Sequence, residues 1–289
     1  MFMTHLTQLP NLIIEPMITR ALSEDFGNSG DVTARLLVPE SATGALVMRA
    51  RESGVIAGMQ AAKLTFEVVD KNVTFDVVHS TGKTVSAGDI IARISGPSRS
   101  LLSAERVALN FLGRMSGIAT LTQRYVSKVD GTGVRIAATR KTTPGLRALE
   151  KQAVLAGGGF THRESLSAAI MIKDNHIALA GGVDAALSAI RKTADHMAKV
   201  SVEVDTLEQL EKVLTWAPDV VLLDNMEPET LKTAVKIVGK FDGSKPVLEA
   251  SGGVNLQTVR DIAETGINVI SIGALTHSAP NFDIGMDAE

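Results

Sequence analysis

The sequence predicts an α/β protein, an incomplete TIM-like α/β barrel with a smaller N-terminal α+β domain. Two observations predict this fold. After about residue 120, short β-rich runs alternate with segments that have the periodicity of amphipathic helices. Every one of these runs ends in polar residues or glycine. In a barrel the carboxyl ends of all strands meet at one mouth, whereas in an open sheet functional residues gather at one switch point. The even distribution favours a barrel, one or two strands short of eight.

The first 120 residues predict a small α+β unit of the open-faced sandwich type. An amphipathic helical segment covers residues 13–27 and ends in glycine. Strand-like runs separated by glycine-containing turns follow at residues 44–53, 55–59, 73–80 and 89–97. We place the domain boundary between residues 120 and 121. The C-terminal tail is free to pack back on the first domain.

A long amphipathic helical stretch at residues 103–129 leads into the barrel, residues 121–289. The predicted barrel strands are Val134–Ala138, Ala168–Ile172, Val200–Val204, Val220–Leu223, Pro246–Ala250 and Asn268–Ile272. Helix-period segments lie between them at residues 146–157, 183–197, 206–214, 228–238 and 255–266. Strands that alternate with helices in this way pair in parallel through right-handed crossovers.

Composition excludes several classes of function. The formal net charge of −3 and the 3% of aromatic residues argue against a dedicated nucleic-acid binder. There is no cysteine, which excludes disulfides, zinc–thiolate sites, iron–sulfur clusters and cysteine nucleophiles. No apolar stretch approaches the roughly 20 residues of a membrane helix, and the N-terminus lacks a signal-peptide pattern. We therefore expect a cytoplasmic protein without a membrane partner.

Basic residues are concentrated in one part of the chain. Between Arg135 and His176 there are seven Lys or Arg against three acids. The cations expected at the barrel mouth are Arg140, Lys141, His162, Arg163 and Lys173. Any one of them could be an ordinary solvated loop charge, but cations that gather at one mouth repel each other unless an anion binds there. A planar dicarboxylate would suit the bidentate fork of arginine.

Two acids close apolar strands. Glu203 lies in "VSVEV" and Asp224 ends "VVLLD". Each could simply cap the next helix or pair with a lysine. If both face the mouth, they could bind Mg²⁺ or sugar hydroxyls, because hard cations prefer oxygen ligands.

Glycines end the last two predicted strands. The segments are "SGG", residues 251–253, and "GAL", which begins with Gly273 and Ala274. A glycine at a strand end can serve a turn and nothing more. As a pair on the final strands of a barrel, however, these segments match the place where backbone N–H groups commonly hold a phosphate.

Several blocks of the sequence resemble the quinolinate phosphoribosyltransferase family, the decarboxylating nicotinate-nucleotide pyrophosphorylases of NAD synthesis. The resemblance covers about Ile18 to Asp287, and its most specific part is "TRKTTPGLRALEKQAVLAGGGFTHRESLSAAIMIKDNHI". Further matching blocks are "LLSAERVALNFLGRMSGIAT", "VEVDTLEQL", "LLDNM", "LEASGGV" and "SIGALTHS". One departure is Gln152, which stands where the family usually has an aromatic residue.

The resemblance implies that the chain transfers phosphoribosyl from 5-phosphoribosyl-1-pyrophosphate (PRPP) to quinolinate. Pyrophosphate and CO₂ leave and nicotinate mononucleotide remains. Quinolinate would be held by Arg140, His162, Arg163 and Lys173, with Arg106 donated by a partner subunit in a homodimer or a hexamer of three dimers. Lys141 would contact PRPP, Glu203 and Asp224 its ribose hydroxyls and Mg²⁺, and the amides of Ser251, Gly252, Gly253, Gly273 and Ala274 its 5′-phosphate. The first domain would contribute to the dimer and to the active site.

Three alternatives stay open at this stage. A related type II phosphoribosyltransferase could act on another acid, either nicotinate or the substrate of the molybdenum-operon paralogues. A Schiff-base aldolase could use Lys173, but such a lysine explains neither the arginine pair nor "SGG". A carrier or regulatory module centred on residues 80–97 would not explain the polar residues and glycines that follow all six predicted barrel strands.

Overall fold

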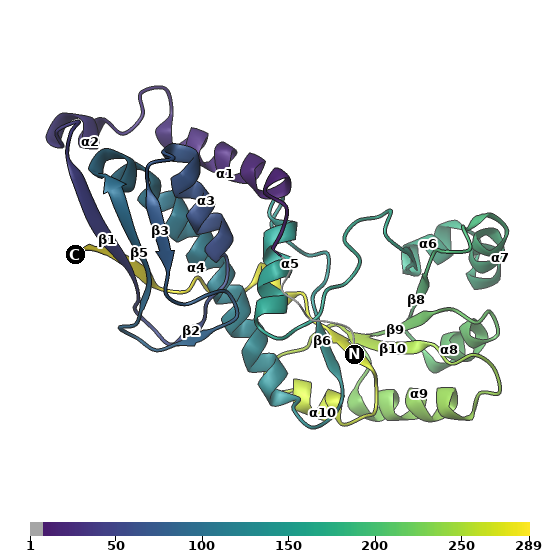
Figure 1. Cartoon of the computed structure of the whole chain (residues 1–289). Coiled ribbons are helices and arrows are strands. Elements are labelled where there is room, and N and C mark those ends of the chain that lie inside the picture. Colours follow the sequence, from purple (N-terminus) through teal and green to yellow (C-terminus); the bar gives the residue numbers. More distant parts are fainter. Residues whose placement is uncertain (1–7) are drawn as a thin grey trace. The chain divides into compact units, whose positions relative to one another are not determined.

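The computed structural model describes residues 8–289, which form two compact units (Figure 1). Unit 1 contains the chain up to Gln123, residues 141–158 and residues 274–289. Unit 2 contains residues 124–140 and 159–273. The chain passes between the two units several times. The single domain boundary between residues 120 and 121 therefore stays a prediction.

Unit 1 is built on an antiparallel sheet of four strands in the order β12-β1-β5-β3. These strands are β1 (Thr43–Ala50), β3 (Thr74–Val77), β5 (Ile90–Pro97) and β12 (Ile284–Ala288). The C-terminal strand β12 pairs with β1, so the last residues of the chain return to the sheet formed by its first strands. A separate small sheet joins β2 (Gly54–Val55) and β4 (Thr84–Val85).

The helices of unit 1 follow from local sequence chemistry. They are α1 (Asn11–Phe26), α2 (Val32–Leu37), α3 (Met59–Val69), α4 (Ser98–Lys128, which runs on into unit 2), α5 (Arg147–Ala156) and α11 (Ala274–His277). Gly27 ends α1 with a positive φ of 51°, which glycine adopts without steric cost. Asp31 caps α2 by accepting a hydrogen bond from the Ala34 N–H at 2.9 Å. Helices α3 and α4 pack on the sheet through one core cluster that includes Phe66, Leu112 and Ile91.

One segment of unit 1 differs from the prediction. The run 55–59 was expected to be a strand, but β2 ends at Val55 and helix α3 begins at Met59. Gly58, with a φ of 85°, lies immediately before the helix. Short apolar runs do not distinguish a strand from the start of a buried helix, which explains the error.

Unit 2 contains a parallel sheet of six strands in the order β6-β11-β10-β9-β8-β7. The strands are β6 (Arg135–Ala137), β7 (Ile170–Ile172), β8 (Val200–Val204), β9 (Val220–Asp224), β10 (Val247–Ser251) and β11 (Val269–Ser271). The first strand pairs with the last, and each of the others pairs with its successor, as in a barrel. The ring is open because β6 and β7 are the two ends of this order. The predicted α/β fold class, with an N-terminal antiparallel α+β sheet, is confirmed.

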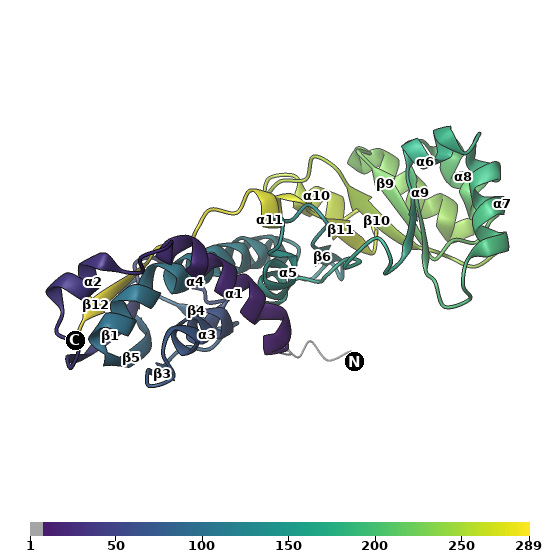
Figure 2. The ribbon, with the colours of Figure 1, turned by 90° about the horizontal axis from the view of Figure 1, so that it is seen from above.

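The connecting helices of unit 2 are α6 (Asp174–Leu179), α7 (Val183–Thr193), α8 (Leu207–Leu214), α9 (Pro228–Lys240) and α10 (Val259–Ala263) (Figure 2). The alternation of β8 separates two faces of the sheet. Val202 and Val204 are fully buried on one face, whereas Glu203 points to the other. No helix within residues 8–289 is long and apolar enough to cross a membrane.

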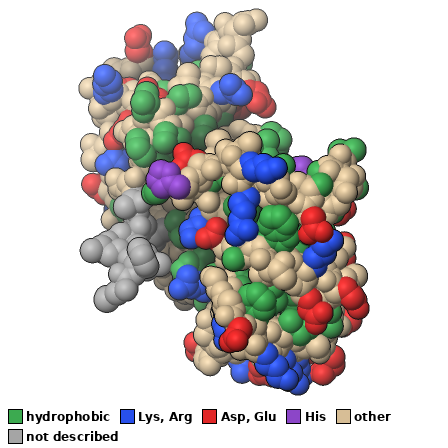
Figure 3. Space-filling model, turned by 90° about the vertical axis from the view of Figure 1, so that its right-hand side faces the viewer, with side chains coloured by type: hydrophobic (Ala, Val, Ile, Leu, Met, Phe, Trp, Pro, Cys, Tyr) green, Lys and Arg blue, Asp and Glu red, His purple; other side chains and the backbone are tan. Residues whose placement is uncertain are grey.

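Basic and acidic side chains are intermixed over the face of the molecule seen in Figure 3, with hydrophobic side chains between them. The described residues therefore form no continuous basic surface on this face.

Candidate active site

One face of the unit 2 sheet carries the predicted residues Glu203, Asp224 and Ser251, and strand register explains why. Glu203 of β8 is in register with Leu222 of β9, which is in register with Glu249 of β10. Two residues further along, Asp224 is in register with Ser251. Residues in register on parallel strands, and residues two apart on one strand, point to the same face. We call this the inner face; it carries Glu203, Asp224, Glu249, Ser251 and Ser271.

Lys173 and Glu203 form an ion pair at the carboxyl end of this face. Ile172 is in register with Val202, so the next residues, Lys173 and Glu203, lie opposite each other. The Lys173 Nζ donates to the Glu203 Oε2 at 2.5 Å. The Glu203 side chain is 9% exposed and that of Lys173 is 44% exposed, so the carboxylate is the buried partner. A predicted substrate cation and a predicted metal carboxylate thus neutralise each other in the free protein.

Arg163 is a partly buried arginine with a second arginine, Arg140, in its neighbourhood. Burial, and then the neighbouring charge of Arg140, lower the pKa of Arg163. The Arg163 guanidinium is positioned by its hydrogen bond to the Ala169 carbonyl at 3.0 Å. Two partly buried guanidinium groups that lie near each other repel, and a bound anion would lower this repulsion.

His162 is oriented by two neighbours. The Arg163 backbone N–H donates to its Nδ1 at 2.8 Å, which leaves the proton of a neutral ring on Nε2. That Nε2 lies 3.5 Å from the Glu249 Oε1. Glu249 is buried and also accepts a hydrogen bond from the Ser271 hydroxyl. Glu249 and Ser271 were not among the predicted site residues, although the acid immediately before "ASGG" could have indicated the first of them.

The "SGG" segment forms a tight turn at the end of β10. Gly252 has a φ of 94°, and a Cβ atom there would collide with the side chain of Asn225, so only glycine fits. The Asn225 backbone N–H donates to the Ser251 carbonyl at 2.9 Å, and its side chain donates to the Asp224 Oδ2 at 2.7 Å. Gly253 also has a positive φ and is exposed, with no atom close to where a Cβ would stand. The turn therefore leaves open space beside its backbone.

The carboxylates suit a magnesium ion that arrives with a phosphorylated substrate. Glu203 and Asp224 lie on neighbouring strands of the inner face. Among the described residues, no group of three or more His, Asp or Glu is arranged to hold a metal ion by itself. Mg²⁺ is usually bound through one or two carboxylates together with substrate phosphates and water, so this donor set fits that mode rather than an all-protein cage.

The remaining predicted residues belong to unit 1. Lys141 is exposed, and its backbone carbonyl accepts a hydrogen bond from the Thr276 hydroxyl at 2.7 Å. Ala274 begins α11 directly after Gly273, the last residue of unit 2. Arg106 is an exposed residue of α4. The other predicted residues belong to unit 2: Arg140, His162, Arg163, Lys173, Glu203, Asp224, Ser251, Gly252, Gly253 and Gly273.

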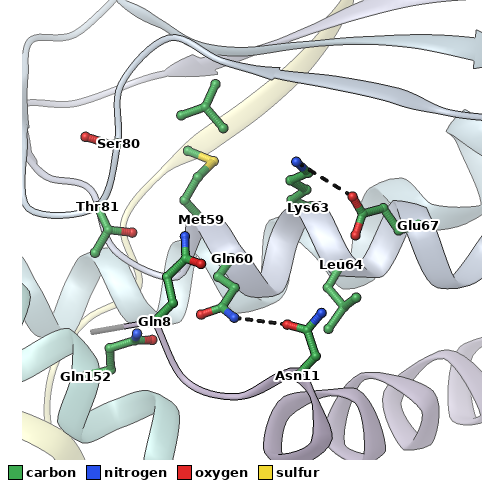
Figure 4. Close-up of a pocket in the computed structure, with 11 residues that line it drawn as sticks. Gln8, Asn11, Met59, Gln60, Lys63, Leu64, Glu67, Ser80, Thr81 and Gln152 are labelled. Atoms are coloured by element: carbon green, nitrogen blue, oxygen red, sulfur yellow. Dashed lines mark hydrogen bonds and ion pairs between the residues drawn. The ribbon is translucent and has the colours of Figure 1, made fainter. Parts of the chain in front are cut away.

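A cavity of about 510 Å³ in unit 1 is unrelated to these residues (Figure 4). It is lined by glutamines and asparagine from different elements, among them Gln8, Gln60 and Gln152. Its one cation, Lys63, is ion-paired with Glu67 at 3.7 Å. A dianionic substrate would find no cluster of positive charge in this cavity. Gln152, the departure from the family pattern, lies on its wall.

Comparison with known proteins decides the family. Two family models match consecutive parts of the chain: "Quinolinate phosphoribosyl transferase, N-terminal domain" at residues 31–116 and the C-terminal domain of the same name at residues 118–287. The chain belongs to the quinolinate phosphoribosyltransferase family. The carboxylating nicotinate-nucleotide pyrophosphorylase of Mycobacterium leprae is 41% identical over 93% of this chain and 95% of its own length.

More distant relatives and solved structures agree with this family. A mitochondrial quinolinate phosphoribosyltransferase of Nicotiana tabacum is 39% identical over 96% of this chain and 82% of its own length. The solved structure of the nicotinate-nucleotide pyrophosphorylase from Francisella tularensis superimposes with a TM-score of 0.92 at 34% identity, covering 98% of this chain and 99% of that one. Quinolinate phosphoribosyltransferase activity in NAD biosynthesis is therefore the activity of this chain. Family membership decides against the aldolase and carrier-module alternatives.

Proposed function

We propose that quinolinate binds in unit 2 with its two carboxylates against Arg140, His162, Arg163 and Lys173. The observation that carries this proposal is the Arg163 guanidinium, which is held by the Ala169 carbonyl at 3.0 Å; burial, and then the nearby charge of Arg140, lower its pKa. Each guanidinium can form two parallel hydrogen bonds to one carboxylate, which a lysine cannot. The neighbouring carboxylates of a pyridine dicarboxylate would offset the repulsion between the two arginines.

In the same proposal, PRPP occupies the ends of the later strands. Glu203 and Asp224 bind its ribose hydroxyls and the Mg²⁺ that it brings, and Lys141 contacts its phosphates. The 5′-phosphate is taken by the backbone amides of Ser251, Gly252, Gly253, Gly273 and Ala274. The open space beside the "SGG" turn supports this placement, because a phosphate can approach its backbone closely.

Catalysis then consists of positioning and electrostatics. The pyridine nitrogen attacks the anomeric carbon of PRPP, the carbon–nitrogen bond forms and the bond to pyrophosphate breaks. Mg²⁺, when bound, supplies charge stabilisation for the leaving pyrophosphate. The carboxylate next to the ring nitrogen then leaves as CO₂. Its electron pair stays on that ring carbon, stabilised by the positive nitrogen, until a proton is taken up. No covalent enzyme intermediate is required.

The ion pair between Lys173 and Glu203 has a consequence for this scheme. In the free protein the two groups are bound to each other at 2.5 Å. Quinolinate attracts the lysine and the Mg²⁺–PRPP complex attracts the carboxylate, so binding of both substrates exchanges one ion pair for two. The pair therefore keeps the buried Glu203 neutralised until the substrates arrive.

The assembly and the compartment are also proposals. We propose that Arg106 of one subunit reaches the quinolinate site of its partner in a dimer or a hexamer, and that the reaction takes place in the cytoplasm. The exposure of Arg106 on α4 supports the first of these, because its guanidinium is accessible to a second chain.

Separate substitutions of the adjacent cations test the division of the site. Arg140→Ala should raise the KM for quinolinate by about tenfold or more and change the KM for PRPP little, because it removes a charge-assisted hydrogen-bonding group. Lys141→Ala should raise the KM for PRPP by about tenfold or more and change the KM for quinolinate little. Steady-state kinetics with each substrate varied in turn measure both constants. If both variants changed the two KM values equally, the assignment of Arg140 to quinolinate and of Lys141 to PRPP would be contradicted.

A further inference from the structure

A buried carboxylate in unit 1 has no part in the chemistry described above. Glu150 of α5 is completely buried, and four donors converge on its two oxygens. The Arg114 Nε and NH2 donate to Oε1 at 3.2 and 2.8 Å. The Thr143 hydroxyl donates to Oε1 at 2.7 Å, and the Thr143 backbone N–H donates to Oε2 at 3.0 Å. Burying a carboxylate is costly unless donors satisfy it, and here they do.

Arg114 extends these contacts to the C-terminal segment. It donates to the Ala279 carbonyl at 3.0 Å and also to the Thr276 carbonyl. The Thr276 hydroxyl in turn donates to the Lys141 carbonyl at 2.7 Å. Arg114, Glu150, Thr143, Thr276 and Lys141 thus form one connected set of hydrogen bonds, which we call the Glu150 network. All five residues belong to unit 1.

The Glu150 network holds the loop after β6 at two points. The carbonyl of Lys141 and the N–H of Thr143 are fixed on either side of Thr142. Directly after this, the Leu146 N–H donates to the Thr143 carbonyl at 3.0 Å and closes the Pro144–Gly145 turn. Two fixed points two residues apart determine the direction of the chain through Lys141, and so where its side chain starts.

The same network holds the segment that follows Gly273. Thr276 contributes both its hydroxyl and its carbonyl, and it lies two residues after Ala274. The two segments of unit 1 that carry predicted PRPP contacts are therefore tied to each other through Arg114 and Glu150.

We propose that Glu150 is a positioning residue for PRPP: its buried carboxylate, fixed by Arg114, sets the backbone of the Lys141 loop through Thr143. The inference rests on the proposed assignment of Lys141 to PRPP. Glu150 touches no substrate. Loss of the Glu150 carboxylate would raise the KM for PRPP and lower the turnover number. The quinolinate contacts of unit 2 are positioned by other groups, such as the Ala169 carbonyl that accepts a hydrogen bond from Arg163.

The test uses the full-length enzyme and removes one hydroxyl. Thr143→Val replaces the donor to Glu150 by a methyl group of the same size. We expect the KM for PRPP to rise by about tenfold and the KM for quinolinate to stay within about twofold. Thr143→Ser restores the hydroxyl and should return the KM for PRPP to within about twofold of the unmodified enzyme.

The matched control is Thr65→Val, the same change at a buried threonine of α3 that donates to the Ala61 carbonyl at 2.8 Å. It should lower the melting temperature without changing the KM for PRPP. A second variant, Glu150→Gln, keeps the side-chain shape and can still accept from Arg114, but its amide N–H₂ would face the Thr143 N–H, donor against donor. It should reproduce the effect of Thr143→Val on PRPP.

Two results would overturn the proposal. One is an unchanged KM for PRPP in both Thr143→Val and Glu150→Gln while Lys141→Ala raises it. The other is an equal rise of both KM values in Thr143→Val, which would indicate that the substitution disturbs the structure of both substrate sites. If Lys141→Ala itself leaves the KM for PRPP unchanged, the assignment of Lys141 fails, and that failure is separate from the first two results.

Discussion

Arg163→Ala should raise the KM for quinolinate by about 100-fold, since a charge-assisted bidentate contact in a partly buried site is among the strongest single hydrogen-bonding interactions. The fold should be preserved, because the substitution removes a guanidinium whose pKa is lowered by burial and then by the neighbouring charge of Arg140. Arg163→Lys retains the charge but not the planar fork, and it should give an intermediate KM. Initial rates at varied quinolinate and saturating PRPP measure the constant.

Arg191→Ala is the matched control for this variant. Arg191 is another arginine of unit 2, exposed on α7, and its guanidinium lies 5.6 Å from the centre of the Trp216 ring. The same loss of charge at this position should leave both KM values unchanged. A normal KM for quinolinate in Arg163→Ala, with melting temperatures equal to that of the control, would remove Arg163 from the carboxylate site.

Glu203→Gln should lower kcat/KM for PRPP by about 100-fold, as expected when an electrostatic contact to the reacting group is lost. Its effect on quinolinate should have the opposite sign. The carboxylate that occupies Lys173 at 2.5 Å is replaced by a neutral amide, so the lysine becomes more available and the KM for quinolinate should stay equal or fall. The concentration of Mg²⁺ at half-maximal rate should rise, since one oxygen ligand loses its charge.

Glu229→Gln provides the comparison for this second variant. Glu229 is an exposed acid of α9 that pairs with Lys232 at 2.7 Å, and this pair lowers its pKa. An exposed ion pair of this kind contributes little free energy. The kcat/KM for PRPP, the KM for quinolinate and the Mg²⁺ dependence should therefore match those of the unmodified enzyme. Parallel losses for PRPP and quinolinate in Glu203→Gln would show that the residue acts on folding and does not distinguish the substrates.

The barrel strands could be predicted because each is short, apolar and followed by polar residues or glycine. Val200–Val204 is reproduced residue for residue, and the other strands agree within two residues at each end. The C-terminal strand β12 was not predicted as a strand, because its partner β1 lies more than 230 residues earlier and no local pattern links them. The position of α5 in unit 1 escaped prediction for the same reason.

The site could be predicted only in part. Periodicity and strand ends indicated Lys173, Glu203 and Asp224, and the structure places the first two in contact. The sequence does not show that their charges cancel, because the pairing depends on register between β7 and β8. Glu249 is marked only by the "ASGG" that follows it, and Glu150 stands among charged residues of an amphipathic helical segment, where a single acid is not distinctive. Their partners, Ser271 and Arg114, are 22 and 36 residues away in the chain and become neighbours only in the folded protein.

The stoichiometry of the reaction shows directly whether this enzyme decarboxylates quinolinate. Purified enzyme is supplied with Mg²⁺, PRPP and quinolinate labelled in the carboxylate next to the ring nitrogen, and labelled CO₂, pyrophosphate and nicotinate mononucleotide are counted. We predict one CO₂ and one pyrophosphate for each nicotinate mononucleotide, and no product when nicotinate, which lacks the second carboxylate, replaces quinolinate. Turnover of nicotinate without CO₂, or no turnover of quinolinate with Mg²⁺ present, would contradict a decarboxylating phosphoribosyl transfer to quinolinate.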